Sequence, residues 1–414
     1  MKKVRSGAGY FYRRSGTIRG INRMKDIVDR AALQKATDIT IKRYPYFSVR
    51  VVKKDGSYWL AENDNPISVR ESNVQISLGG RASNYHLIDV SCWENIIYVD
   101  YFHGISDGIG MLQFTKTLLY YYCCYRYNIT LDGTGVRLVD TPITDEELDE
   151  PFPEEPITGI EAFDLKLPKE AFKLPDKIDP DNPTRYLYEV QLPMKSFMKY
   201  TKAHDGSPAV ICSLFLARAI DAIFPDSELP LVCEMALNVR PILNKPLAHH
   251  NTLEMLYLTY QKEMRKLSIE TQAGCFRGMV FLQSSEEHII SSINNDIMFN
   301  KMLDAQDSIE KKQALMLSLT DGNKKKSFMV SYEGQANFGS IEEYMIDKSL
   351  LAERTLPELL VEITSVSDAI QVDFLQAVKN EEYFRMFVKL LEDEGIPCQV
   401  SKPLEYTIPG VGFE

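Results

Sequence analysis

The chain has 414 residues, of which 44% are hydrophobic and 25% charged, and this length exceeds what one core usually holds, so we expect two domains. The formal net charge of −11 argues against a nucleic-acid partner. No apolar run reaches the ~18 residues of a membrane span, no secretory signal is recognisable, and the seven cysteines lack metal-binding spacing, so we predict a cytoplasmic protein that does not span a membrane.

Apolar periodicity and strand-like runs predict a mixed α/β fold. In the first half of the chain we expect helices at 26–40 and 109–127 and strands at 48–52, 58–61 and 95–102. In the second half we expect helices at 194–203, 208–223, 253–272 and 382–393, and strands at 187–192, 231–237, 328–331, 359–365 and 369–374. The proposed helix 253–272 rests on Leu253, Leu256, Tyr257 and Tyr260, which would share one helical face.

The composition changes in the middle of the chain. Prolines and acidic residues are concentrated between positions 140 and 183, where prolines disfavour both helices and central strands. A long segment of this kind indicates a linker or a functional loop. We therefore predict an N-terminal lobe at 1–150, a connector at 151–183 and a C-terminal lobe at 184–414.

One short motif carries the strongest chemical signal. The hexapeptide His103-Gly104-Ile105-Ser106-Asp107-Gly108 lies between the predicted strand 95–102 and the predicted helix 109–127. A loop between a strand and a helix can hold a side chain rigidly at a cleft. Because an imidazole titrates near neutral pH, His103 is a candidate general base. The alternative is that Asp107 only caps the helix and that His103 is an incidental loop residue.

The hexapeptide resembles the active-site signature of the CoA-dependent acyltransferase superfamily. That superfamily includes chloramphenicol acetyltransferases, alcohol acetyltransferases and the condensation domains of peptide synthetases. Three further segments resemble family landmarks and follow in the family's order, namely 31–51, 234–241 and 330–339. The closest similarity is to the branch of alcohol acetyltransferases and condensation domains, and it extends over most of the chain.

The resemblance implies a fold and a set of roles. It implies two chloramphenicol-acetyltransferase-like lobes, each a mixed sheet flanked by helices, with an active-site tunnel between them. His103 would be the general base. Asp107 would turn away from the histidine and pair with an arginine, for which Arg50 and Arg240 are the candidates, while Gly108 would pack at the helix start.

The second family motif is altered in this chain. Asn337 stands where the family usually has Asp, and Ser340-Ile341 replace Trp-Gly after Gly339. This departure makes the chemistry of peptide-synthetase condensation domains the less favoured interpretation. Asn337 and Gly339 are candidate substrate- or CoA-binding residues that support the acyl carbonyl or shape the tunnel, or they form a turn that closes the second lobe.

Two other clusters are weaker candidates. The pair His249-His250 could bind a metal, but neighbouring residues on a strand face opposite sides and no carboxylate cluster is near, so we favour a loop pair and expect no metal site. The run Lys324-Lys325-Lys326 could meet the phosphates of CoA, although such runs are usually solvated.

The resemblance therefore predicts a freestanding, monomeric acyltransferase without a permanently bound cofactor. It would transfer an acyl group, acetyl or another short chain, from acyl-CoA to a hydroxyl of a small-molecule acceptor, with an amine acceptor left open. One alternative is a condensation-type enzyme that takes its acyl group from a carrier protein and forms an amide or ester. Another is a non-catalytic binding or scaffolding member.

Overall fold

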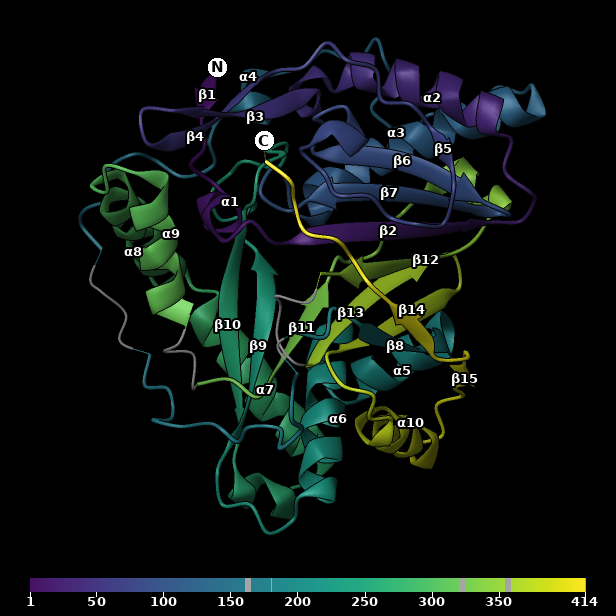
Figure 1. Ribbon diagram of the computed structural model, residues 1–414. Coiled ribbons are helices and arrows are strands. Elements are labelled where there is room, and N and C mark those ends of the chain that lie inside the picture. The colour runs from purple at the N-terminus through teal and green to yellow at the C-terminus, as the bar shows by residue number, and fades with distance from the viewer. Residues whose placement is uncertain (161–164, 180, 321–324, 354–358, 414) are drawn as a thin grey trace.

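The computed structural model describes residues 1–160, 165–179, 181–320, 325–353 and 359–413. Two lobes are stacked one above the other, and each is built on a sheet with helices packed against it (Figure 1). The buried apolar side chains form two large clusters, one for each lobe. The chain is therefore a mixed α/β protein, as predicted.

The upper lobe contains the first sheet. Its strands within the described chain are, in order, β12 (Met345–Ala352), β2 (Thr17–Met24), β7 (Ile96–Phe102), β6 (Ile88–Trp93) and β5 (Arg70–Glu71). Neighbouring strands are antiparallel except for β5 and β6, which are parallel. A small sheet beside it consists of β1 (Lys2–Lys3), β4 (Ser57–Glu62) and β3 (Val49–Lys54).

The lower lobe contains a larger mixed sheet. Its described strands follow the order β10 (Leu253–Tyr260), β9 (Leu231–Asn238), β11 (Phe328–Tyr332), β13 (Leu359–Val366), β14 (Ala369–Gln376), β8 (Arg185–Pro193) and β15 (Gln399–Val400), and β16 (Leu404–Tyr406) also pairs with β8. Strand β11 runs parallel to both of its neighbours, whereas the other pairs are antiparallel.

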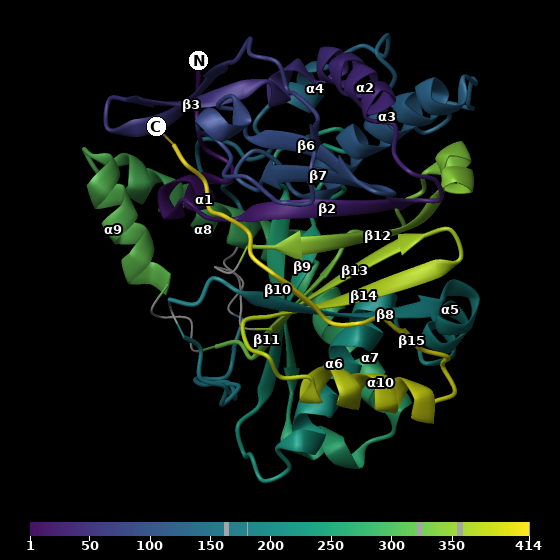
Figure 2. The same ribbon diagram turned by 45° about the vertical axis from the view of Figure 1, so that its right-hand side comes forward.

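Helices cover the outer faces of the two sheets (Figures 1 and 2). The upper lobe has α1 (Ala8–Arg13), α2 (Arg30–Arg43), α3 (Gly108–Tyr127) and α4 (Asp145–Leu148), and α2 packs against α3. The lower lobe has α5 (Met194–Ala203), α6 (Pro208–Ile223), α7 (Ile269–Gln283) and α10 (Glu382–Asp393). Helices α8 (Glu286–Asp304) and α9 (Ile309–Thr320) lie beside the two lobes, where α8 contacts α7 and β10 and α9 packs against α1 of the upper lobe (Figure 1). Short 3-10 helices occupy Pro45–Phe47, Arg81–Ser83, Lys262–Lys266 and Gly339–Tyr344.

Two segments from the second half of the chain belong to the upper lobe. Strand β12 comes from the second half, yet it pairs along its length with β2 of the upper sheet. The C-terminal segment also returns to the upper lobe, where the ring of Phe413 packs against those of Phe11, Tyr58 and Phe102 (Figure 1). The predicted boundaries at residues 150 and 183 stay a prediction. They would assign β12 to the C-terminal lobe, although this strand belongs to the upper sheet.

Several predicted elements agree closely with the structure. The predicted helices 194–203, 208–223 and 382–393 coincide with α5, α6 and α10, and each predicted strand overlaps a strand of a sheet. The proline-rich segment 140–183 has little regular structure where it is described, apart from the short helix α4, which precedes the predicted connector. That helix is held in place by Glu147, whose carboxylate forms a buried ion pair with Arg43 at 2.8 Å.

The predicted helix 253–272 is wrong. Residues Leu253–Tyr260 form strand β10, which pairs with β9 over eight consecutive residues, and helix α7 begins only at Ile269. The helical spacing of the apolar residues misled because Glu254 is buried with the alternate side chains of the strand. The buried face therefore follows a period of two, which a hydrophobic pattern alone did not reveal.

Within the described residues, no single helix has both the length and the apolar composition of a membrane span. The pair α5 and α6 meets those two criteria together but is bent by 81°.

Candidate active site

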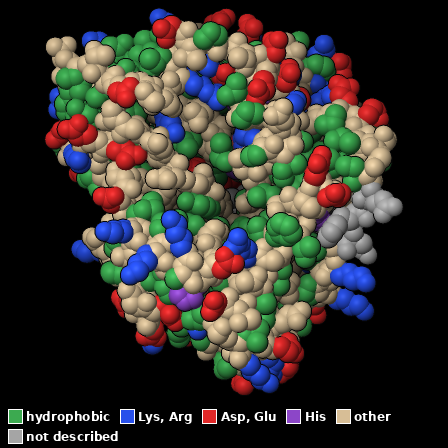
Figure 3. Space-filling model, turned by 180° about the vertical axis from the view of Figure 1, so that it is seen from behind, with side chains coloured by type: hydrophobic (Ala, Val, Ile, Leu, Met, Phe, Trp, Pro, Cys, Tyr) green, Lys and Arg blue, Asp and Glu red, His purple; other side chains and the backbone are tan. Residues whose placement is uncertain are grey.

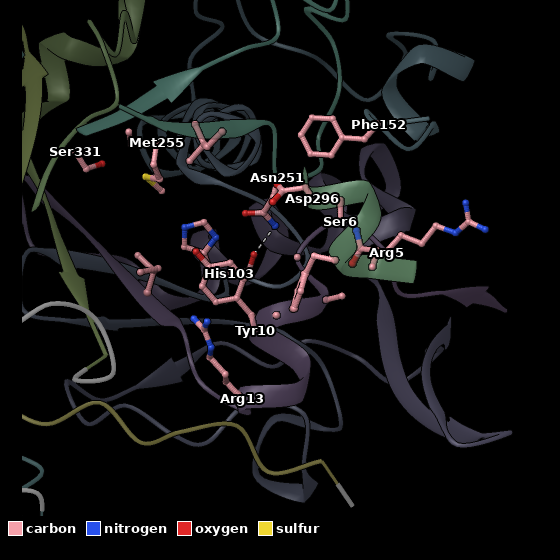
Figure 4. Close-up of a pocket in the computed structure, with 18 of the residues that line it drawn as sticks. Arg5, Ser6, Tyr10, Arg13, His103, Phe152, Asn251, Met255, Asp296 and Ser331 are labelled. Carbon is pink, nitrogen blue, oxygen red and sulfur yellow. Dashed lines mark hydrogen bonds between the residues drawn. The ribbon is translucent and has the colours of Figure 1, made fainter. Parts of the chain in front are cut away.

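The candidate histidine is fixed by its backbone at the boundary between the lobes. His103 directly follows β7, and its amide donates a hydrogen bond to the carbonyl oxygen of Gly16 at 2.8 Å. Its own carbonyl oxygen accepts a hydrogen bond from Nδ2 of Asn251 in the lower lobe at 2.7 Å (Figure 4). Contacts from both sides therefore hold this loop residue in one position.

The imidazole ring of His103 stacks on the ring of Tyr10. The two ring centres are 4.5 Å apart and the rings are inclined by only 10°. Burial lowers the pKa of His103 from its ordinary value of 6.5, and the Asp107 carboxylate opposes this shift only in part. The ring is consequently neutral near pH 7, as a general base requires.

Two cavities meet at His103. One has a volume of about 370 Å³ and the other about 60 Å³. Figure 4 shows the larger one, with Tyr10 and Arg13 of the upper lobe on one side and Asn251 and Met255 on another. The back of the molecule is hollowed near its centre, with hydrophobic side chains gathered around the hollow (Figure 3). Both cavities are lined by Ile18, His103, Ala236, Leu253, Ser331 and Glu362.

Asp107 turns away from the histidine and pairs with Arg240. Two guanidinium nitrogens of Arg240 donate to the two carboxylate oxygens at 2.8 and 2.9 Å. The carboxylate also accepts hydrogen bonds from the amides of Gly110 and Thr252, at 2.9 and 3.0 Å. Asp107 is fully buried and Arg240 nearly so, which makes this a clamp between the start of α3 and the loop after β9.

The remaining predicted site residues lie elsewhere. Arg50 is exposed on β3 in the small sheet and does not reach Asp107. Asn337 is also exposed, and its side-chain oxygen accepts a hydrogen bond from the amide of Gly339 at 2.9 Å. Gly339 has a positive φ of 56°, which is typical of a turn. Neither Asn337 nor Gly339 lines the two cavities at His103.

Gly108 opens helix α3 and lines the smaller cavity. A Cβ at this position would lie 2.5 Å from the Oε1 atom of Glu333. Glu333 is itself held by a buried ion pair with Lys348 and has little freedom to move away. Glycine therefore allows this carboxylate to approach the helix start.

Gly110, two residues further along α3, offers a direct test of this close packing. A Cβ there would lie 2.3 Å from the carbonyl oxygen of His249 and 2.4 Å from Oγ of Ser106. We expect Gly110→Ala to lower the free energy of unfolding by about 1–3 kcal/mol, because backbone must shift. The matched control is Gly274→Ala in α7, where an added Cβ would have no described atom within 4 Å outside its chain neighbours and the nearby backbone of its own helix. Urea unfolding of both variants checks the difference. Equal stability of the two would contradict the crowding.

The two weaker clusters have local partners. His249 and His250 lie in the loop between β9 and β10, and burial lowers the pKa of each to about 3. Among the described residues, no group of three or more His, Cys, Asp or Glu side chains is placed to hold a metal ion. Lys326 forms an ion pair with Glu234, and Lys324 lies outside the described residues.

Several neighbours of His103 were not predicted from the sequence. Tyr10, Asn251 and Glu362 belong to segments far from the hexapeptide, and only folding brings them together. Glu362 alone left a trace in the sequence, because a lone carboxylate interrupts the apolar strand 359–365. A charged residue in such a strand points to a partner or a function.

Comparison with known proteins identifies the fold. No protein-family model and no curated protein sequence matches this chain. Solved structures do. TRI101 of F. graminearum, complexed with coenzyme A and T-2 mycotoxin, superposes with a TM-score of 0.61 at 11% identity, over 97% of this chain and 100% of that one.

Two further solved structures are also similar to this chain over nearly its whole length. TRI3 trichothecene 15-O-acetyltransferase of F. sporotrichioides superposes with a TM-score of 0.61 at 10% identity, over 94% of each chain. The first condensation domain of the CDA synthetase gives a TM-score of 0.57 at 12% identity, over 94% of this chain and 95% of that one. The chain therefore has the two-lobed, chloramphenicol-acetyltransferase-like fold of acyltransferases and condensation domains.

Proposed function

We propose that the protein is an acyltransferase that moves a short acyl group, such as acetyl, from acyl-CoA to a hydroxyl of a small molecule. The observation that carries the proposal is the position of His103, a neutral imidazole at the point where two cavities meet. A thioester entering by one cavity and an acceptor entering by the other would meet at this ring. The similar structures that hold coenzyme A, or are O-acetyltransferases, support this choice of chemistry.

The proposed reaction uses His103 as base and then as acid. Its free ring nitrogen takes the proton of the acceptor hydroxyl while the oxygen attacks the thioester carbonyl. The carbon–sulfur bond then breaks, and the imidazolium returns the proton to the departing thiolate of CoA. Asp107 takes no part in proton transfer in this scheme, since its two oxygens are occupied by Arg240 and by backbone amides. It is a positioning residue for the loop that carries His103.

The proposal predicts an unusual acid limit of the pH profile. Only the neutral imidazole accepts a proton, and burial lowers the pKa of His103 below 6.5. As pH falls, kcat/KM should therefore stay constant through pH 6.5 and decline only below it. Steady-state thiol release across a pH series, with an acceptor alcohol that carries no basic nitrogen and therefore does not depend on a charged carboxylate, measures this limb. A midpoint above pH 6.5 would contradict the assignment of His103 as the titrating base.

Thermal unfolding with acyl-CoA ligands tests the proposed donor without knowledge of the acceptor. Acetyl-CoA present at a hundred times its dissociation constant adds about 2.7 kcal/mol of stability and raises the midpoint. We expect a saturable shift with acetyl-CoA or a longer acyl-CoA, followed by thiol release in a screen of small alcohols. Binding of no acyl-CoA would count against a diffusible CoA donor.

The similarity to a condensation domain favours one second candidate. In that reaction a carrier protein would present the acyl thioester, and the product would be an ester or an amide. His103 would act in the same way. An acyl carrier protein that supports transfer where acetyl-CoA does not would establish this alternative.

A further inference from the structure

One carboxylate beside His103 has no role in the proposed reaction. Glu362 lies on β13 and lines both of the cavities that meet at His103. The residue is only 8% exposed, and its Oε2 atom is buried without a hydrogen-bond partner among the described residues. The hydroxyl of Ser331 hydrogen-bonds to the same carboxylate. One oxygen is thus left available at the centre of the site.

The charges around Glu362 do not balance. Lys348 is the nearby cation, but its ammonium is already paired with Glu333, and both of these side chains are buried. The pKa of Glu362 is raised to about 7, because burial and the neighbouring Glu333 charge together outweigh the lowering effects of the Ser331 hydrogen bond and of Lys348. Two carboxylates therefore share one ammonium in a buried environment, where an unpaired charge is costly.

None of the other charged residues that line the larger cavity is among the groups that shift the pKa of Glu362. Arg5 is paired with Glu154 at 2.6 Å, and the guanidinium of Arg13 lies beside Tyr10, which belongs to the same helix (Figure 4). Asp296 comes from α8, and although its side chain is exposed at the surface, partial burial raises its pKa to about 6. The deepest charge next to His103 is consequently negative. Ile18, Ala236 and Leu253, which line both cavities, offer it no countercharge.

We propose that Glu362 binds a protonated amine of the acceptor, so that the enzyme acylates a hydroxyl on a molecule that also carries a basic nitrogen. This inference rests on the proposed acyltransferase function and names its acceptor class. An ammonium group would donate a hydrogen bond to the open carboxylate oxygen and would supply the missing positive charge. A neutral hydroxyl in its place would satisfy the oxygen but leave the charge unbalanced.

A matched pair of probes separates charge from shape. 2-(Dimethylamino)ethanol and 3-methylbutan-1-ol have the same branched outline, but only the former is a cation at neutral pH, and its nitrogen cannot be stably acylated. With acetyl-CoA as donor, we expect kcat/KM for the amino alcohol to exceed that for the alcohol by about tenfold, the value of one charge-assisted hydrogen bond. Equal values for the two probes in the wild-type enzyme would overturn the proposal.

Two substitutions locate the preference at Glu362. Glu362→Gln should abolish the preference, so that kcat/KM becomes the same for the amino alcohol and for 3-methylbutan-1-ol. Glu362→Met serves as a second variant, because replacing an unpaired buried charge by an apolar side chain favours folding. The control is Asp296→Asn at the exposed rim, which should retain the preference. If Glu362→Gln or Glu362→Met retained it, or if Asp296→Asn abolished it, Glu362 would not be the amine site.

Binding distinguishes failure of this inference from failure of the proposed function. Calorimetric titration should show that the wild-type protein binds 2-(dimethylamino)ethanol about tenfold more tightly than Glu362→Gln does. Such a difference without thiol release from any acyl-CoA would refute acyl transfer from CoA and leave the amine site intact. Thiol release without any difference in binding or in probe preference would support acyl transfer from CoA and refute the amine site.

Discussion

Replacing His103 with alanine is expected to lower kcat for acyl transfer by about 10²–10⁴-fold, the usual contribution of a positioned general base. The affinity for acyl-CoA, measured by thermal shift, should change little, because the ring abstracts a proton and does not anchor the nucleotide. Thiol release measures kcat with the acceptor that the screen identifies.

His204→Ala is the matched control for that experiment. His204 follows α5 in the lower lobe and stacks on Tyr200, away from both cavities. It should fold and transfer acyl groups like the wild type. Normal folding and full activity of His103→Ala would refute the proposed function, and a loss of activity in His204→Ala would show that the effect is not specific to the site.

Removal of Arg240 is expected to have the largest effect on stability. Arg240→Ala leaves the fully buried Asp107 carboxylate without its cation, and breaking such a pair costs about 3–5 kcal/mol. It also frees the carbonyl oxygens of Ala248 and His250, which accept hydrogen bonds from the same guanidinium. Urea unfolding should show this loss as a lower midpoint, and activity should fall because the loop that carries His103 loosens.

Arg50→Ala provides the comparison. Its side chain is exposed, and substitutions at exposed positions usually change stability by no more than ~0.5 kcal/mol. Combining Asp107→Asn with Arg240→Ala should recover part of the loss, since no buried charge then remains unpaired. An Arg240→Ala protein as stable as Arg50→Ala would contradict the clamp between the lobes.

The sequence allowed the mixed fold and the position of His103 to be predicted because both depend on local signals. Helices α5, α6 and α10 have strong periodicity or clear ends, and the hexapeptide is one continuous segment between β7 and the start of α3. Strand β10 was predicted as a helix because its apolar side chains follow two periods at once, and only pairing with β9 decides between them.

The site was predictable only where its residues lie close together in the sequence. Asp107 was expected to pair with an arginine, but the choice between Arg50 and Arg240 depends on how β9 is placed against α3, which no local pattern encodes. Tyr10 and Glu362 reach His103 from positions about 90 residues before it and about 260 after it, so tertiary packing alone assembles that part of the site.

The strand β12 has a consequence for how the protein is made. Until residues 345–352 have been synthesised, β2 has no partner on one side, although nearly all of its side chains are buried in the finished sheet. At 5–20 residues per second, roughly 10–40 s separate the completion of residue 150 from that of β12. During this interval the nascent chain presents an open strand edge with unpaired backbone amides and carbonyls, which is a site of aggregation and of chaperone binding. A fragment that ends at residue 150 would keep this edge permanently, so we expect it to be insoluble unless a peptide containing 345–352 is supplied.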